Sequence, residues 1–254
     1  MKKILIGMLT FAFVLTACGG GGGGGGSATS TPLAHTGTGL CANDYFPVVE
    51  GATWTYAGTG PEGDVTWVST VTDATSEGFT LTNQFDELTA IQQWGCNADG
   101  IAALNYGGGP EASLTTNGLT GTFETTNQTG TTFPRHINVG DTWTQTFTIH
   151  GEITITEGTT AIADGTVTQN YSAIGMESVS VPAGTFNALK LEINIQFALQ
   201  IDMGLGTAIP LSFESSGTNW IVQNVGWVKQ DSTTIIEGGD AIASSTELQS
   251  YSIP

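Results

Sequence analysis

Basic side chains are nearly missing from this 254-residue sequence. It has 5 Lys and Arg residues against 23 Asp and Glu residues, which gives a formal net charge of −18. Proteins that bind the phosphates of DNA or RNA need a basic surface, so nucleic acid is excluded as a partner. Charged residues of both signs make up only 11% of the chain, but 39% is hydrophobic. That apolar content is enough for a folded core and excludes wholesale disorder.

Long hydrophobic runs are also missing. The longest apolar stretch, residues 4–14, follows two lysines and is too short for a membrane-spanning helix, which needs about 20 residues. A short basic start, an apolar stretch and small residues before a cleavage point are typical of a secretory signal. The sequence Leu15-Thr16-Ala17-Cys18 resembles the lipobox of bacterial lipoproteins at every position. A plain secretory signal with a coincidental cysteine is the alternative.

The lipobox resemblance implies that Cys18 carries a diacylglyceryl group, that the signal is cleaved before it, and that the new N-terminus receives an acyl chain such as palmitate. Two or three lipid chains hold a protein at a membrane. The expected partner is therefore the membrane, through the lipid anchor, and the expected location is the cell envelope outside the cytoplasm. Gly19 stands where Asp often marks inner-membrane retention. This favours the outer membrane in a cell that has two.

Eight consecutive glycines, residues 19–26, follow the cysteine. Such a composition is typical of a flexible tether. The sequence thus predicts a signal peptide over 1–17, a lipidated tether over 18–39 and a β-rich domain over 40–254. Loss of the signal leaves three basic side chains against 23 acidic ones, a net charge of −20. We interpret this acidity as a device for solubility that also keeps the domain clear of anionic lipid headgroups.

Cysteine is scarce, and its few positions are informative. With Cys18 assigned to lipid, Cys41 and Cys96 remain. An even pair in an oxidising compartment predicts a disulfide. Closing a loop of this length stabilises a fold by roughly 4 kcal/mol in the chain-entropy model. Two free thiols are the alternative, and the shortage of neighbouring histidines disfavours a zinc site.

Alternation of apolar and polar residues, many of them threonine, dominates the chain from about residue 40. The clearest run is Leu189–Met203, where every second residue is apolar; it predicts one half-buried strand about 50 Å long. Further strands are predicted at residues 52–57, 64–71, 78–83, 89–94, 101–106, 141–149, 151–157, 166–171, 220–230 and 233–236. No segment has a convincing helical period, although one short helix fits between Ile201 and Phe213.

These patterns predict a nearly all-β fold: a large curved antiparallel sheet, or half-barrel, with room for one short helix in its concavity. Phe46-Pro47 before Trp54 is echoed by Phe133-Pro134 before Trp143. Each pair predicts a tight turn that leads into a strand with a buried tryptophan. Two small β-domains are an alternative, but we favour one domain because the long strand needs partners from the first half.

Three patches, residues 43–56, 179–187 and 224–229, resemble segments of uncharacterised bacterial lipoproteins. The resemblance implies a curved antiparallel sheet related in shape to the LolA and LolB lipoprotein carriers. It implies no activity and no site residues, because that family has no agreed function.

Motifs for catalysis and for metal binding are absent from the sequence. The serine-hydrolase patterns Gly-x-Ser-x-Gly and Ser-x-x-Lys do not occur. The Asp-x-Asp-x-Asp-Gly calcium loop is missing, and His35, His136 and His150 lack metal-ligand spacing. Residues 58–63 match the letters of a dinucleotide fingerprint but lack the helix that must follow. We therefore predict no catalytic residues, no metal and no cofactor.

The apolar face of the long strand is the one candidate site. If it is not fully packed, it forms a groove for a hydrophobic ligand; otherwise its residues are core. The groove would be lined by Ile193, Ile195, Phe197, Leu199 and Trp227.

The sequence favours a non-enzymatic, membrane-anchored binding or structural module of unknown ligand. A carrier of a hydrophobic ligand or lipoprotein is one alternative, and a cavity above roughly 300 Å³ in the concavity would favour it. A secreted hydrolase is the other alternative. It would need convergent carboxylates or a Ser-His pair in a cleft.

Overall fold

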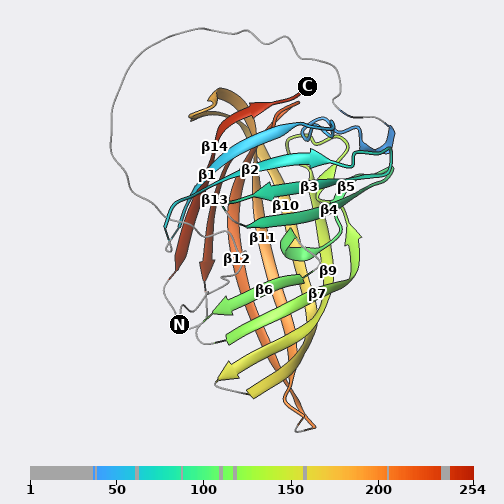
Figure 1. Ribbon diagram of the computed structural model, residues 1–254, viewed down its shortest axis with the longest axis vertical. Coiled ribbons are helices and arrows are strands. Elements are labelled where there is room, and N and C mark those ends of the chain that lie inside the picture. The colour runs from blue at the N-terminus through green and yellow to red at the C-terminus, as the bar shows by residue number, and fades with distance from the viewer. Residues whose placement is uncertain are drawn as a thin grey trace.

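The alternating, threonine-rich segments form β-strands that hydrogen-bond into one curved antiparallel sheet, as the computed structural model of the chain shows (Figure 1). The structure describes residues 37, 39–60, 63–86, 88–108, 111–116, 119–156, 159–204, 206–235 and 241–254. The predicted signal peptide, Cys18 and nearly all of the tether lie outside these ranges. Within them, no helix is both long enough and apolar enough to cross a membrane.

Fourteen strands are described, in the sheet order β6-β7-β9-β10-β11-β12-β13-β14-β1-β2-β3-β4-β5-β8. The strands are β1 (Thr53–Thr59), β2 (Val65–Thr72), β3 (Gly78–Gln84), β4 (Thr89–Cys96), β5 (Gly100–Ala103), β6 (Glu111–Thr116), β7 (Leu119–Gly130), β8 (Phe133–Pro134), β9 (Thr142–Thr156), β10 (Thr159–Val181), β11 (Gly184–Asp202), β12 (Ala208–Val222), β13 (Gly226–Ile235) and β14 (Ile242–Ser252). Two short 3-10 turns, η1 (Gly39–Cys41) and η2 (Tyr106–Gly108), complete the described elements.

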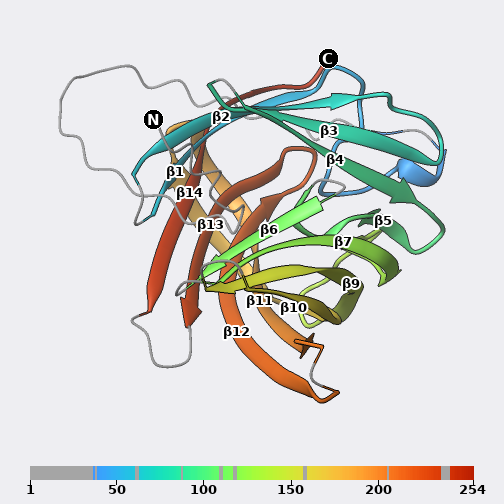
Figure 2. The ribbon, with the colours of Figure 1, turned by 60° about the horizontal axis from the view of Figure 1, so that its bottom comes forward.

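The long central strands form a trough whose concave side holds the core. In β11, Leu189, Leu191, Phe197, Leu199 and Ile201 are buried while the residues between them are mostly exposed, as expected for a strand with one face in a core. Figures 1 and 2 show β1 to β4 curving across the upper end of the long strands, with β6 and β7 in front of their lower half. This curvature encloses the concave side.

A polar seam joins the two ends of the sheet. After β7, the chain crosses to the far edge, where β8 pairs with β5 and Thr132 N donates to Ile101 O at 3.1 Å. Gln145 of β9, which is 0% exposed, lies next to the segment that crosses from β7 to β8. Its Nε2 donates to Ala103 O at 2.9 Å, and its Oε1 accepts from Thr132 Oγ1 at 2.6 Å. Gln145 breaks the apolar alternation of its strand because it satisfies backbone and hydroxyl groups at this seam.

A disulfide and an aromatic cluster fix the segment that precedes β1. Cys41 is bonded to Cys96 at the end of β4, with the two Cα atoms 5.0 Å apart. The segment then places Phe46 among five aromatic rings, at centroid distances of 5.5 to 5.9 Å. These rings belong to Trp54, Phe79, Trp94, Phe133 and Trp227. The Phe-Pro echo of the sequence therefore brings Phe46 and Phe133 into one cluster.

The segment between Ile201 and Phe213, where the sequence left room for one short helix, has no helix among its described residues. The described residues there, 201–204 and 206–213, form the end of β11, a turn and the start of β12. The element that reaches into the concavity is η2 instead: the Tyr106 ring lies 5.7 Å from Phe147 and 5.4 Å from Phe197. A hairpin suits residues 201–213 because alternation continues on both sides of a glycine-containing turn.

Two strand assignments also change. Residues 220–230, expected as one strand, contain the turn between β12 and β13, where Asn224 has a φ of 60° and Gly226 a φ of 99°. The segments 141–149 and 151–157, expected as two strands, belong to the single strand β9. Gly151 does not end that strand; it allows close pairing with β7, because a Cβ at this position would collide with the carbonyl oxygen of Thr122.

Candidate binding site

The concave face of the sheet contains a cavity of about 310 Å³. Its wall is formed by β11 to β13 and by the aromatic residues of β1, β2 and β4, and η2 lies over it. Aromatic and aliphatic side chains dominate the wall. Cavities of this size and lining are typical of sites for small ligands with a large apolar part.

Four of the five residues proposed from the sequence line this cavity: Ile193, Ile195, Phe197 and Trp227. The fifth, Leu199, is 1% exposed and belongs to the closed core below the cavity. It was placed in the groove because alternation puts it on the same face as Ile195 and Phe197. Alternation alone does not show where along a strand the packing stops.

The two ends of the cavity are both aromatic but differ in polarity. At one end, Trp227 lies 6.3 Å from Trp94 and 4.9 Å from Phe133, measured between ring centroids. At the other end, Phe197 stacks on Phe213 at 4.1 Å and meets the edge of Tyr106. The first end also holds the indole of Trp94 and the amide of Asn219, and the polar side chains of Gln169 and Ser215 lie between the two ends, beside Ile195.

Most polar groups of the cavity wall are hydrogen-bonded to each other. Ser69 Oγ donates to Asn83 Oδ1 at 2.5 Å, and Tyr171 OH donates to Gln169 Oε1 at 2.8 Å. Tyr56 OH donates to the carbonyl oxygen of Trp227 at 3.2 Å. Burial raises the pKa of Tyr56 and of Tyr171 well above the ordinary tyrosine value, so both hydroxyls stay neutral donors.

Two buried polar atoms of the cavity wall have no hydrogen-bond partner among the described residues. They are Trp94 Nε1 and Asn219 Oδ1. The two residues are 3% and 6% exposed, respectively. A buried donor or acceptor without a partner costs roughly 1–3 kcal/mol. No motif in the sequence points to this pair, because Asn219 lies in β12, most of which was not predicted as a strand.

Charge is almost absent from the cavity. Among its lining residues the single charged side chain is Lys229. Its Nζ lies 3.3 Å from Glu247 Oε1 and 3.7 Å from Asp231 Oδ2, and 5.6 Å from the ring centroid of Trp220. These contacts already compensate the ammonium. No Asp, Glu, His or Cys among the described residues lines the cavity.

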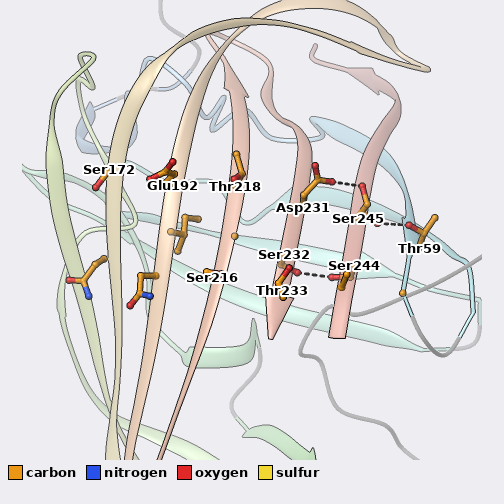
Figure 3. A pocket seen from close by; sticks show the side chains of 16 residues that line it. Thr59, Ser172, Glu192, Ser216, Thr218, Asp231, Ser232, Thr233, Ser244 and Ser245 are labelled. Atoms are coloured by element: carbon orange, nitrogen blue, oxygen red, sulfur yellow. Dashed lines mark hydrogen bonds between the residues drawn. The ribbon is translucent and has the colours of Figure 1, made fainter. Parts of the chain in front are cut away.

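A second, larger hollow of about 780 Å³ lies on the opposite face of the same strands (Figure 3). Its lining is mostly Ser, Thr and Asn, together with Glu192 and Asp231. Ser245 Oγ donates to Asp231 Oδ1 at 2.6 Å, and Ser232 and Ser244 share a hydrogen bond of 2.6 Å. We refer to it as the outer groove. Its polar groups bond to one another, and no aromatic ring lines it.

Histidine and metal chemistry lie outside both hollows. Among the described residues, His136 Nδ1 contacts Asp44 Oδ2 and His150 Nδ1 contacts Asp164 Oδ1, each at 2.7 Å. Neither histidine lines the cavity or the outer groove. No group of three or more His, Cys, Asp or Glu residues suited to a metal ion occurs in the part of the chain that the structure describes.

The DUF3108-like family model matches residues 116–248, more than half of the chain. The chain belongs to the DUF3108-like family. The match runs from the β6–β7 region to β14. It therefore contains the strands β11 to β13 that carry the cavity and the outer groove. Two of the three patches with lipoprotein resemblance, 179–187 and 224–229, fall inside this DUF3108-like region. The first patch, 43–56, lies before it.

Three solved structures are similar to this DUF3108-like chain. A candidate lipoprotein from Parabacteroides distasonis has 15% identity and a TM-score of 0.45, covering 83% of this chain and 99% of its own. A candidate exported protein with a YmcC-like fold from Bacteroides fragilis has 14% identity and a TM-score of 0.40, covering 83% and 100%. The hypothetical lipoprotein YmcC from Escherichia coli has 10% identity and a TM-score of 0.33, covering 80% and 85%. No curated protein matches the sequence.

Proposed function

We propose that this DUF3108-like protein is a non-enzymatic binding module of the cell envelope, held outside the cytoplasm by lipid on Cys18. The concave cavity is its binding site, and its ligand is hydrophobic over most of its length. The observation that carries the proposal is the cavity itself: about 310 Å³, lined by aromatic and aliphatic side chains. That volume lies above the roughly 300 Å³ at which apolar pockets begin to hold small ligands.

Access from solvent supports binding over simple core packing. Ile193, Ile195 and Phe213 are only half-buried although they lie on the concave face. The neighbouring wall residues Ser215 and Thr234 are half-buried as well. A fully packed sheet face would cover these side chains as completely as Leu191 and Leu199, which are each 1% exposed. The wall between β11 and β13 is thus the entrance that we assign to the ligand.

The test is a titration with N-phenyl-1-naphthylamine, a neutral dye that fluoresces in apolar sites. The full-length chain with Cys18→Ser, which removes the lipid acceptor, serves as the parent protein in buffer without detergent. Ile195→Trp should fill the cavity and weaken dye binding at least about tenfold. Ala198→Trp, on the exposed face of the same strand, is the matched control and should bind like the parent. Absence of dye binding to the parent, or equal binding by both variants, would refute the proposal.

The lipid anchor has its own test. Cells that express the native chain should incorporate labelled palmitate into it, and the protein should sediment with membranes. Cys18→Ser should abolish both results. Membrane association of the Cys18→Ser protein after signal processing would show that the anchor lies elsewhere. In a cell with two membranes, Gly19 after the lipidated cysteine favours the outer membrane, and density-gradient separation of the membranes checks this point.

A further inference from the structure

The chemistry of the cavity wall narrows the class of ligand, on the basis of the proposed function. Trp94 Nε1 is a hydrogen-bond donor and, in the amide orientation of the structure, Asn219 Oδ1 is an acceptor. Other polar groups of the same wall, such as Ser69, Asn83 and Tyr171, bond within the protein. Because buried polar groups are nearly always paired in native proteins, two unpaired groups in one cavity point to partners supplied by a ligand.

Both unpaired groups belong to the Trp227 end of the cavity. The Trp94 ring lies 6.3 Å from the Trp227 ring. In the pairing of β12 with β13, Ile221 lies opposite Trp227. Asn219 is two residues before Ile221 in β12 and lies opposite Gln230. Both side chains line the cavity, so the polar part of a ligand at this end lies beside the residues that carry the donor and the acceptor. The Phe197 and Phe213 rings at the other end offer it only apolar contact.

The cavity also favours a ligand without net charge. A carboxylate or phosphate buried here would need a positive partner, since an unpaired buried charge is very costly. The ammonium of Lys229, the charged lining residue, is already paired with the carboxylates of Glu247 and Asp231, at 3.3 and 3.7 Å. No other charged side chain lines the cavity. A neutral head group avoids this cost.

We propose that the ligand is a neutral amphiphile: an apolar chain or ring system that lies against Phe197 and Phe213, with a head group that accepts a hydrogen bond from Trp94 Nε1 and donates one to Asn219 Oδ1. Monoacylglycerols, fatty alcohols and fatty amides belong to this class. Free fatty acids in their anionic form and phospholipids do not.

The test is displacement of N-phenyl-1-naphthylamine by three compounds with the same acyl chain, each kept below its micelle-forming concentration. These are 1-monolauroylglycerol, which donates and accepts; methyl laurate, which only accepts; and laurate, which is anionic. On the Cys18→Ser parent, 1-monolauroylglycerol should displace the dye at a concentration about fivefold lower than methyl laurate, as one added hydrogen bond predicts. Laurate should be the weakest of the three.

Two variants assign the contacts. Trp94→Phe should weaken the binding of both neutral compounds about fivefold, because both accept a hydrogen bond from the indole N–H. Asn219→Leu should weaken the binding of 1-monolauroylglycerol by a similar factor and leave the binding of methyl laurate unchanged. Thr218→Val, the neighbouring residue in β12 that lines the outer groove, is the matched control. Thermal unfolding of each variant shows whether it is folded, and the ranking of the three compounds on the parent tests the proposal without any variant.

The outcomes separate the two proposals. Dye binding with laurate as the strongest competitor overturns the neutral-amphiphile assignment and keeps the cavity as a binding site. Dye binding with no effect of either variant means that water alone satisfies Trp94 and Asn219, which also overturns the assignment. Failure of the dye to bind the parent overturns the proposed function itself.

Discussion

The cavity and the outer groove occupy the two faces of the same strands, and they differ in almost every property. Along β11, Ile195 and Phe197 line the cavity, Glu192 and Asn194 line the outer groove, and Ile193 borders both hollows. The groove is larger, about 780 Å³ against 310 Å³. Its hydroxyl and carboxylate groups bond to one another, whereas the cavity holds aromatic rings and two unpartnered polar atoms. Volume alone would therefore point to the wrong face.

The difference follows from the two-residue period of a strand. Serine, threonine and acidic side chains dominate the outer groove, and aromatic side chains line the cavity on the concave face. Among the described residues that line the cavity, Lys229 alone is charged, so the cavity stays nearly uncharged although the chain is strongly acidic.

Removal of the disulfide should disturb the cavity far more than the outer groove. Cys41 leads into Phe46, and Cys96 follows Trp94 at the aromatic end of the cavity. The double variant Cys41→Ser/Cys96→Ser should lose about 4 kcal/mol of unfolding free energy, measured by urea titration. Dye affinity in the folded variant should fall as well. A loss below about 1 kcal/mol would mean that the aromatic cluster holds this segment without the disulfide.

High pH should unfold the protein through the concave face. Burial raises the pKa of Tyr56 and Tyr171 in the folded protein, so the stability is fully present below about pH 10, where unfolded tyrosines begin to ionise. Above that pH the unfolded chain loses its protons first, and each tyrosine should cost about 1.4 kcal/mol per pH unit. Urea titrations between pH 9 and 11 measure this slope.

Matched variants show whether the buried tyrosines cause this pH dependence of the unfolding free energy. Tyr56→Phe and Tyr171→Phe should each flatten it, whereas Tyr251→Phe, at a side chain that is 41% exposed, should not. An unchanged slope in both buried variants would show that these tyrosines ionise without unfolding of the concave face.

Gln145 should be essential for closing the seam between β5, β8 and β9. Gln145→Leu leaves Ala103 O and Thr132 Oγ1 without their partners, and we expect a loss of about 2 kcal/mol in unfolding free energy. Thr144→Val is the control: Thr144 is exposed and bonds only to Asn170 on the outer face. Equal stabilities for the two variants would refute the role of Gln145.

The outer face should contribute the smallest effect, through His150. The hydrogen bond and the charge of Asp164 raise the pKa of His150. A raised folded-state pKa means that the contribution is fully present below about pH 6, near the ordinary histidine value, and is lost as the pH rises past the folded-state pKa. His150→Gln should therefore be less stable than the native chain at acidic pH and equal to it at alkaline pH. The opposite order would contradict the interaction.

Local pattern was enough to predict part of the molecule. The alternation in Leu189–Met203 predicted β11 with nearly the observed bounds, and the cysteine count predicted the bond between Cys41 and Cys96. By contrast, β14 (Ile242–Ser252) was missed because its residues are mostly Ser, Thr and other polar types, with only Leu248 buried. Its place is set by pairing with β1 and β13, which no local pattern reveals.

The site required contacts between distant parts of the chain. Trp94 lies in β4 and Asn219 in β12, and only the curvature of the sheet brings both to one cavity. The alternation correctly predicted that Ile193, Ile195 and Phe197 share one face of the strand. It could not show that Ile195 lines a cavity whereas Leu199, on the same face, is packed in the core. Register and curvature decide this point.

Photo-crosslinking compares ligand contact with the two faces of the sheet in one experiment. A monoacylglycerol with a diazirine in its acyl chain is irradiated with the native lipidated protein, and the labelled peptides are mapped by mass spectrometry. We expect adducts on the concave residues Ile195, Phe197 and Trp227. Adducts on Glu192, Thr218 and Asp231 of the outer groove, with the concave residues unlabelled, would contradict this expectation.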